Sequence, residues 1–357
     1  MVPPEPILSV PRPLRDHGFH PLRVARVVEE TAEAVSLVLE VPNEMAGAFS
    51  YRAGQFCNVQ VVIEGQAQMR CYSMSSSPAL GEDMAVTVKR VPGGMVSNWI
   101  ADNLRPGDRV ELSPPAGFFQ LTDTSGDLVA LAAGSGITPV FSLVKTALAT
   151  TGRRVRLHYA NRDPDSVIFA AHLRELEGRH GGRLTVVHSY DGEHGLLTEE
   201  TVSAFAGEAA ATGEFYVCGP GPYMEIVENA LRSLGVEPAR IHIERFTTAE
   251  LLVGAPPPPP GPPGGTRVTV ELDGRTDSTD HRPGTTILQT ARQMGMSPPF
   301  SCESGSCATC MARLLQGSVS MFVNNALTPE EVEEGWILTC QSVPTTPAVR
   351  VAYGSEH

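Results

Sequence analysis

Residues 302–310 read Cys-Glu-Ser-Gly-Ser-Cys-Ala-Thr-Cys, and a fourth cysteine, Cys340, follows after 29 further residues. The spacing of Cys302, Cys307, Cys310 and Cys340 is typical of a plant-type 2Fe–2S site, in which four thiolates hold two irons. The small residues of this loop let backbone N–H groups turn toward the sulfurs. A structural zinc site is the alternative, but zinc usually takes two short Cys or His pairs. The stretch therefore predicts an iron–sulfur domain.

A proline run precedes this domain. Seven prolines lie within residues 254–265, and such a run favours a polyproline II spacer that cannot enter a sheet interior. It could instead be the ligand of a proline-binding module, but its position between two folded segments favours a linker over residues 249–266. The iron–sulfur domain is then expected at residues 267–357, with strands near 267–272, 311–315 and 349–353 and a helix near 286–294.

The pattern of expected secondary structure before the linker changes near residue 125, from short strands to alternating strands and helices. Short strands rich in Val, Ile, Tyr and Phe are expected first, at 22–28, 35–41, 56–63, 69–74, 84–90 and 109–113, with one helix at 95–103. Six strands at this spacing predict a small antiparallel β-barrel over residues 20–124. Residues 1–19 are expected to be a flexible N-terminal extension.

Strands and helices alternate in the second part of this body. Strands are expected at 128–133, 155–161, 184–189, 214–218 and 240–246, with helices at 139–150, 168–179, 198–205 and 223–234. Such alternation predicts an α/β domain with a parallel sheet over residues 125–248, and a ligand outside the carboxyl ends of its strands. The fold class is therefore multidomain.

Two motifs in the barrel point to a phosphate-bearing aromatic ligand. Alternation along the fourth strand puts Arg70 and Tyr72 on one face, where Arg70 could hold a pyrophosphate and Tyr72 could pack on a planar ring. The Gly94 turn opens a helix containing Ser97 and Asn98, and its N–H groups suit an anion. Phe118 and Phe119 could stack on an aromatic ligand, or pack in the core.

Two glycine-rich loops follow strands of the parallel sheet. The first contains Gly134, Gly136 and Thr138, and two glycines let a dinucleotide approach the backbone. The second begins with Cys218 and continues as Gly219-Pro220-Gly221. Two such loops at one sheet edge predict a crevice, where Cys218 is favoured as a contact of the reacting ring over a packed core thiol.

Together these motifs resemble the oxygenase reductases of the ferredoxin–NADP reductase superfamily that carry a C-terminal plant-type ferredoxin domain, over residues 20–357. The matching motifs are Arg70-x-Tyr72-Ser73, Gly94-x-x-Ser97, Gly134-x-Gly136-x-Thr138 and Cys218-Gly219-Pro220. Further segments, including Val88-Lys89-Arg90 and Tyr159-Ala160-Asn161-Arg162, look most like the 3-ketosteroid 9α-hydroxylase type. Phthalate dioxygenase reductase, which carries FMN, shares the domain order but resembles the chain less.

The resemblance implies a fold and a set of site residues. It implies a flavin barrel, a nicotinamide domain and a β-grasp (α+β) ferredoxin domain. It implies the metal ligands Cys302, Cys307, Cys310 and Cys340. It also implies that Tyr72, Ser73, Cys218 and Phe246 lie at the reacting rings, although Phe246 could instead be a core residue. The implied cofactor-binding residues are Arg70, Tyr72, Ser73, Val88, Gly94, Ser97, Asn98, Gly134, Gly136, Thr138, Asn161, Arg162, Cys218, Gly219, Pro220 and Phe246.

The resemblance also implies a reaction. NAD(P)H would give a hydride to FAD, and single electrons would pass through the 2Fe–2S cluster to a terminal oxygenase, such as a Rieske-type hydroxylase of steroids or aromatics. FAD is expected over FMN because Gly94–Asn98 and the Phe118–Phe119 region offer surfaces for a pyrophosphate and an adenine. Asp163 and Asp165 flank Arg162 where the adenosine ribose is expected, which favours NADH over NADPH.

Three alternatives stay open at this stage. The chain could serve a haem monooxygenase or a diiron epoxidase, or it could be a redox-sensing 2Fe–2S binding protein without enzymatic turnover. The sensor would not need a nicotinamide crevice beside a flavin site.

Charge and composition limit the classes of partner that the chain is expected to bind. The net charge of −13, from 40 acidic and 27 basic residues, argues against nucleic acid and anionic membranes, since both reward a basic surface. The N-terminus lacks the apolar segment of a signal peptide, and cysteines clustered near one end favour metal ligation in a reducing compartment over disulfides. A cytoplasmic monomer is expected. Residues 330–334, mostly glutamate, are either a solvated helix face or part of a docking surface for a basic partner.

Overall fold

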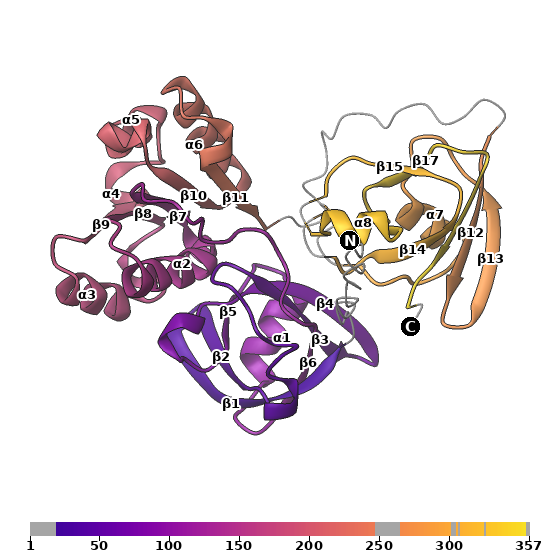
Figure 1. The fold of residues 1–357 in the computed structure, drawn as a ribbon. Coiled ribbons are helices and arrows are strands. Elements are labelled where there is room, and N and C mark those ends of the chain that lie inside the picture. The colour runs from indigo at the N-terminus through magenta and orange to yellow at the C-terminus, as the bar shows by residue number, and fades with distance from the viewer. Residues whose placement is uncertain (1–18, 247–264, 301–304, 306–307, 325, 355–357) are drawn as a thin grey trace, which may run out of the picture.

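The computed structural model describes residues 19–246, 265–300, 305, 308–324 and 326–354. The expected N-terminal extension and most of the expected linker lie outside these residues. Three main sheets lie in successive parts of the chain, an antiparallel one, a parallel one and a mixed one, and a small two-stranded sheet accompanies the mixed one (Figure 1). Within the described residues, none of the helices has both the length and the apolar character needed to span a membrane.

The first sheet is a six-stranded antiparallel barrel in the order β4-β3-β6-β1-β2-β5. A bridge between Met74 and Val86 joins the two outer strands and closes it. Its apolar core includes Val59, Val88 and Ile100, the last from the single helix. The elements are β1 (His20–Thr31), β2 (Ala34–Glu40), β3 (Phe56–Ile63), β4 (Gln66–Ser73), β5 (Ala85–Lys89), α1 (Met95–Asn103) and β6 (Arg109–Leu112).

The second sheet is parallel, in the order β11-β10-β7-β8-β9. Successive residues of β7 face opposite layers: Ala130 packs with α2 and α3, whereas Leu131 packs with α5 and α6. Figure 1 shows these helix pairs on the two faces of the sheet. The elements are β7 (Leu128–Ala133), α2 (Ile137–Thr150), β8 (Val155–Asn161), α3 (Ala170–Arg179), β9 (Leu184–Tyr190), α4 (Asp191–His194), α5 (Glu199–Ala206), β10 (Glu214–Gly219), α6 (Gly221–Ser233) and β11 (Ile241–Arg245).

The chain order of the strands reverses beside β7, whose neighbours are β8 on one side and β10 on the other. Ligands of open α/β sheets bind outside the carboxyl ends of the strands at such a switch point. The two glycine-rich loops follow β7 and β10. These loops therefore lie at the edge of the sheet where the sequence predicts a ligand crevice.

The third sheet is mixed, in the order β13-β12-β18-β14-β16, and β12 and β18 run parallel at its centre. Ile287 and Ala291 of α7 pack against its valines, which gives the β-grasp arrangement. The elements are β12 (Arg267–Leu272), β13 (Arg275–Asp280), α7 (Ile287–Gln293), β14 (Met311–Gln316), β15 (Val319–Met321), α8 (Pro329–Glu333), β16 (Trp336–Leu338), β17 (Ser342–Pro344) and β18 (Ala348–Ala352).

A buried polar seam joins the barrel to α2 of the parallel-sheet domain. Ser142 donates a hydrogen bond to the carbonyl of Ser76 at 2.6 Å, and the hydroxyls of Ser77 and Thr146 lie 2.7 Å apart. Lys145 forms an ion pair with Glu82. Burial lowers the pKa of Lys145, and the hydrogen bond to Glu82 opposes that shift. The seam holds α2 against the segment that leaves β4.

Candidate functional site

The predicted ring-binding residues lie on β4. Arg70 is exposed and Tyr72 is partly buried, and burial raises the pKa of the Tyr72 hydroxyl. Ser73 is 2 % exposed, and its hydroxyl has no hydrogen-bond partner within the described residues. A buried hydroxyl without a partner is costly unless a ligand atom completes it. The β4 end therefore fits a bound polar ring such as a flavin.

The predicted anion loop precedes α1. Ser97 Oγ accepts a hydrogen bond from the Val91 backbone at 3.1 Å, and Asn98 Nδ2 donates to the carbonyl of Gly94 at 2.7 Å. Both side chains thus shape the turn. Among the residues that the structure describes, no side chain caps the N-terminus of α1, so its first N–H groups suit an anion.

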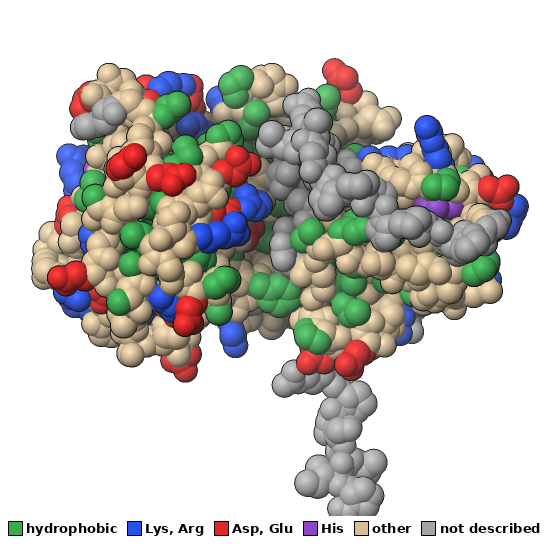
Figure 2. Space-filling model, turned by 90° about the horizontal axis from the view of Figure 1, so that it is seen from above, with side chains coloured by type: hydrophobic (Ala, Val, Ile, Leu, Met, Phe, Trp, Pro, Cys, Tyr) green, Lys and Arg blue, Asp and Glu red, His purple; other side chains and the backbone are tan. Residues whose placement is uncertain are grey.

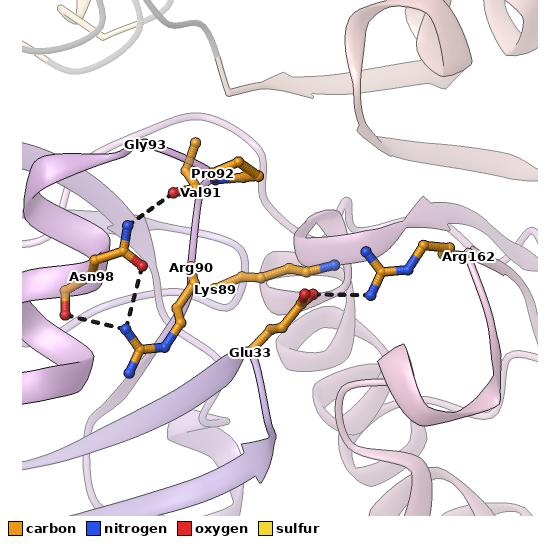
Figure 3. A pocket seen from close by; sticks show the side chains of 8 residues that line it. All are labelled: Glu33, Lys89, Arg90, Val91, Pro92, Gly93, Asn98 and Arg162. Atoms are coloured by element: carbon orange, nitrogen blue, oxygen red, sulfur yellow. Dashed lines mark hydrogen bonds and ion pairs between the residues drawn. The ribbon is translucent and has the colours of Figure 1, made fainter.

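A cavity of about 390 Å³ opens beside this loop, between β5 and the segment after β8 (Figure 3). Three cationic side chains and one acidic side chain line it, namely Lys89, Arg90, Arg162 and Glu33. Arg162 Nη2 lies 3.3 Å from Glu33 Oε2. Cationic side chains beside a helix N-terminus suit the phosphates of a dinucleotide.

The glycine-rich loops after β7 and β10 approach one another very closely. A Cβ at Gly136 would lie 2.1 Å from the carbonyl oxygen of Cys218, and one at Gly219 would lie 2.9 Å from the Tyr223 ring. Gly134 has φ +53, and its nearest neighbour would be Lys89 Nζ at 3.7 Å. Only glycine permits this packing at Gly136. The approach brings the β7 and β10 loops together at the sheet edge and places Gly134 beside a cation of the cavity.

Three further predicted residues surround these loops. Thr138 Oγ1 donates to the carbonyl of Ser135 at 3.0 Å, which fixes the first turn of α2. Pro220 immediately precedes α6. Asn161 is 4 % exposed at the end of β8, and neither polar atom of its side chain has a hydrogen-bond partner of good geometry in the described residues. The loops and Asn161 therefore fit a polar ligand at this edge.

Cys218 and Phe246, two of the residues predicted to contact the reacting rings, differ in how far their side chains are exposed. The Cys218 side chain is fully buried in the core beside α2, and burial raises the pKa of its thiol. This is the core packing that the sequence left as the second option, so contact with a ring stays a prediction for the ligand-bound protein. Phe246 follows β11 and is 38 % exposed. It is not a core residue, and its place against a flavin also stays a prediction.

Cys310 and Cys340 come together although 29 residues separate them. They are 1 % and 6 % exposed and belong to one apolar cluster, and Thr339 Oγ1 donates to the carbonyl of Cys310 at 2.7 Å. Cys302 and Cys307 lie outside the described residues. At Gly305, with φ +77, a Cβ would lie 2.5 Å from the carbonyl of Val323. The same Cβ would lie 2.9 Å from the side chain of Gln341, the neighbour of Cys340, so Gly305 of the loop lies close to the segment that carries Cys340, which fits the predicted ligation of one cluster.

The structure bears on two further expectations and adds residues that the sequence missed. The Val88 side chain is fully buried in the barrel core, so its contact with a ligand stays a prediction, whereas the next residue, Lys89, lines the cavity. Phe119 is a core residue that packs edge-on against Tyr216, whereas Phe118 is exposed. Glu33 was missed altogether. Strand alternation was the signal that favours Lys89 over Val88.

The acidic segment near Cys340 is only partly a solvated face. Residues 329–333 form α8, and Glu331 is 9 % exposed. Its carboxylate accepts a hydrogen bond from the backbone of Thr328 at 2.8 Å in a capping box. Glu330 and Glu333 remain exposed. In the view of Figure 2, acidic and basic side chains are interspersed and form no broad basic field.

Family models match all three parts of the chain. They are described as an oxidoreductase FAD-binding domain over residues 21–121, an oxidoreductase NAD-binding domain over residues 130–229 and a 2Fe-2S iron-sulfur cluster binding domain over residues 270–345.

Several known proteins are similar to this chain over nearly its whole length. The chain is 41 % identical over 349 residues to the ferredoxin reductase component of 3-ketosteroid-9-alpha-monooxygenase from Mycolicibacterium smegmatis, covering 96 % of this chain and 98 % of that protein. It is 32 % identical to one component of the 1,2-phenylacetyl-CoA epoxidase from Escherichia coli, covering 95 % and 98 %. The solved structure of phthalate dioxygenase reductase matches with a TM-score of 0.60 and 25 % identity, over 94 % of this chain and 98 % of that chain.

Proposed function

This chain belongs to the ferredoxin reductase components of oxygenase systems, and we propose that it carries electrons from NADH to a Rieske-type hydroxylase, with a steroid-type substrate favoured. The family supplies the reaction class, with FAD-binding, NAD-binding and 2Fe–2S domains. The choice of hydroxylase rests on the steroid-monooxygenase relative. A diiron epoxidase is the second candidate, because a component of an epoxidase also matches over 98 % of its length.

One observation carries the proposal: the β3–β4 hairpin and its continuation contact both neighbouring domains. Ser76, three residues beyond β4 Ser73, accepts a hydrogen bond from Ser142 of α2 at 2.6 Å. Asn58 of β3 accepts one from Thr309 of the cluster loop at 2.7 Å. The β3–β4 hairpin and its continuation are thus attached to the parallel-sheet domain on one side and to the iron–sulfur domain on the other.

A flavin held there would supply the chemistry that converts a two-electron hydride into single electrons, which matches a cluster that accepts one. The residues of the chain provide position and surroundings for this exchange. Ser73 offers a buried hydroxyl to the ring, Lys89 and Arg162 offer charge to phosphates, and the Gly136–Cys218 contact sets where the nicotinamide loops lie. The four predicted ligands would hold the cluster in an apolar setting, since Cys310 and Cys340 are almost fully buried in one apolar cluster.

The purified protein tests the proposal directly. We expect one FAD and one 2Fe–2S cluster per chain, and rapid NADH-dependent reduction both of ferricyanide, an acceptor for flavin electrons, and of cytochrome c, a protein acceptor of single electrons. Released FMN would contradict the flavin assignment. A protein that binds the cluster but oxidises NADH with neither acceptor would be a redox sensor. The expected cytoplasmic location and monomeric state are part of the proposal, and size-exclusion chromatography checks the second.

The preference for NADH over NADPH depends on how Arg162 is paired. Its guanidinium lies 3.0 Å from Asp163 and 3.3 Å from Glu33, so two carboxylates offset the one cation near the expected ribose. Replacing Glu33 by glutamine removes one of them. We expect Glu33→Gln to raise kcat/KM for NADPH about two- to fivefold, the size of an exposed ion pair, and to leave NADH nearly unchanged.

Glu33 is a cleaner site for this test than Asp163, whose carboxylate also accepts hydrogen bonds from Ser166 and caps a short helical turn. Glu44→Gln, an exposed change elsewhere in the barrel, is the control and should leave both cofactors unchanged. A wild-type preference for NADPH would show that Arg162 dominates the site.

A further inference from the structure

A hydrogen bond between described residues links the iron–sulfur domain to the β3–β4 hairpin of the barrel, the ring-binding hairpin. Thr309 Oγ1 lies 2.7 Å from Asn58 Oδ1, between residues 251 positions apart. Thr309 directly precedes Cys310 in the cluster loop, and it is partly buried. Asn58 is 4 % exposed, so the contact is shielded from water.

The hydrogen bonds around Asn58 fix which amide atom faces the iron–sulfur domain. Asn58 Nδ2 donates to Ser113 Oγ at 3.3 Å, and Ser113 Oγ donates onward to the carbonyl of Pro114 at 3.1 Å. Ser113 must therefore accept from Asn58, which leaves Oδ1 pointing the other way. There Oδ1 accepts from the Cys71 thiol at 3.2 Å as well as from Thr309.

The position of Asn58 ties this contact to the ring-binding strand. Asn58 pairs with Cys71 across β3 and β4, and Cys71 lies between Arg70 and Tyr72. On the other side, the carbonyl of Cys310 is held by Thr339. A short, ordered connection thus runs from a predicted cluster ligand to the strand expected to bind flavin.

We propose that Asn58 and Thr309 are positioning residues that hold the cluster loop against the ring-binding hairpin and so set the rate of the single-electron step. The proposal rests on the proposed function. Each step moves one electron from reduced flavin to the oxidised cluster, and NADH supplies both electrons. Without the Thr309 hydroxyl, a buried amide oxygen loses a donor and the docked arrangement is less populated.

Two single variants and their combination test this from both domains. We expect Thr309→Val and Asn58→Ala each to slow cluster reduction after NADH mixing about three- to tenfold in stopped-flow absorbance. Flavin reduction and ferricyanide turnover should stay near wild type. Because both variants remove the same contact, the double variant should be no slower than the slower single variant. Thr309→Ser, which keeps the hydroxyl, should restore the rate.

A second measurement does not depend on activity. Cys71 is partly exposed, whereas the other described cysteines are buried, and its thiol shares the acceptor of Thr309. We expect Thr309→Val to raise the rate of Cys71 alkylation by iodoacetamide, followed by mass spectrometry of the holoprotein. Thr269→Val is the matched control, since the Thr269 hydroxyl bonds to Ser278 within the iron–sulfur domain; it should change neither measurement.

The outcomes distinguish a failure of the positioning role from a failure of the proposed function. Unchanged cluster reduction in Thr309→Val and Asn58→Ala, with iron content intact, would overturn the positioning role. Slower cluster reduction with unchanged Cys71 alkylation and no recovery in Thr309→Ser would overturn it too, because the defect would then lie in the cluster itself. Failure of the wild-type protein to reduce ferricyanide with NADH would instead contradict the proposed function.

Discussion

Replacing Gly136 by alanine is expected to abolish most NADH-dependent turnover, with kcat/KM for NADH falling about a hundredfold or more. A Cβ at this position would lie 2.1 Å from the carbonyl oxygen of Cys218, 2.4 Å from its carbonyl carbon and 2.8 Å from the nitrogen of Gly219. These are backbone atoms that cannot rotate away. One of the two glycine-rich loops, the one after β7 or the one after β10, must therefore move. A displacement of about 1 Å is enough for a loss of this size.

The backbone itself does not oppose the change, because Gly136 has φ −61 and ψ −12, which any residue adopts. The predicted loss is therefore steric. Gly152→Ala, in the short segment between α2 and β8, is the matched control, since nothing lies within 4 Å of its added Cβ. Steady-state kinetics with ferricyanide, alongside flavin and iron content, measure the effect. If Gly136→Ala retains normal NADH turnover, the nicotinamide does not bind at these loops.

The regular elements of the fold follow from local sequence patterns. Strand β7 is apolar throughout because both of its faces are covered, and its predicted bounds, 128–133, agree with the structure. Helix α1 likewise spans its predicted residues. Strand β13, Arg275–Asp280, was missed because its six residues are all polar and it lies at a sheet edge. A strand without an apolar face gives no alternation to detect.

Residues of the candidate site could be predicted where they form a motif within one loop. They could not be predicted where they pair across two domains. The glycines after β7 and β10 carry their own signal, because close backbone approach requires them. The pairing of Lys145 with Glu82 joins residues 63 positions apart, and that of Glu33 with Arg162 joins residues 129 positions apart. No local pattern specifies either pair. The chain's two lysines, Lys89 and Lys145, both lie where the barrel meets the parallel-sheet domain, which composition alone could not indicate.

Replacing Cys340 by alanine should remove the cluster and with it nearly all reduction of cytochrome c. Cys340 and Cys310 lie in one apolar cluster with Leu338, and an alanine at Cys340 leaves the predicted four-thiolate site with three ligands. Turnover of ferricyanide by NADH should remain within about twofold of wild type, because the barrel and the parallel sheet have cores of their own. Visible absorbance, iron content and the two acceptor assays measure the separation.

The control for this variant is Cys57→Ala, which removes a fully buried thiol that lies 3.7 Å from Met74 Sδ in the barrel. It should keep iron content and cytochrome c reduction, since Cys57 is far from the ligand pattern in sequence and belongs to another sheet. Retained cluster absorbance in Cys340→Ala would show that Cys340 is not a ligand. Loss of ferricyanide turnover together with the cluster would show that the iron–sulfur domain supports the barrel, because a cluster that only passes electrons onward cannot be needed for hydride transfer to flavin.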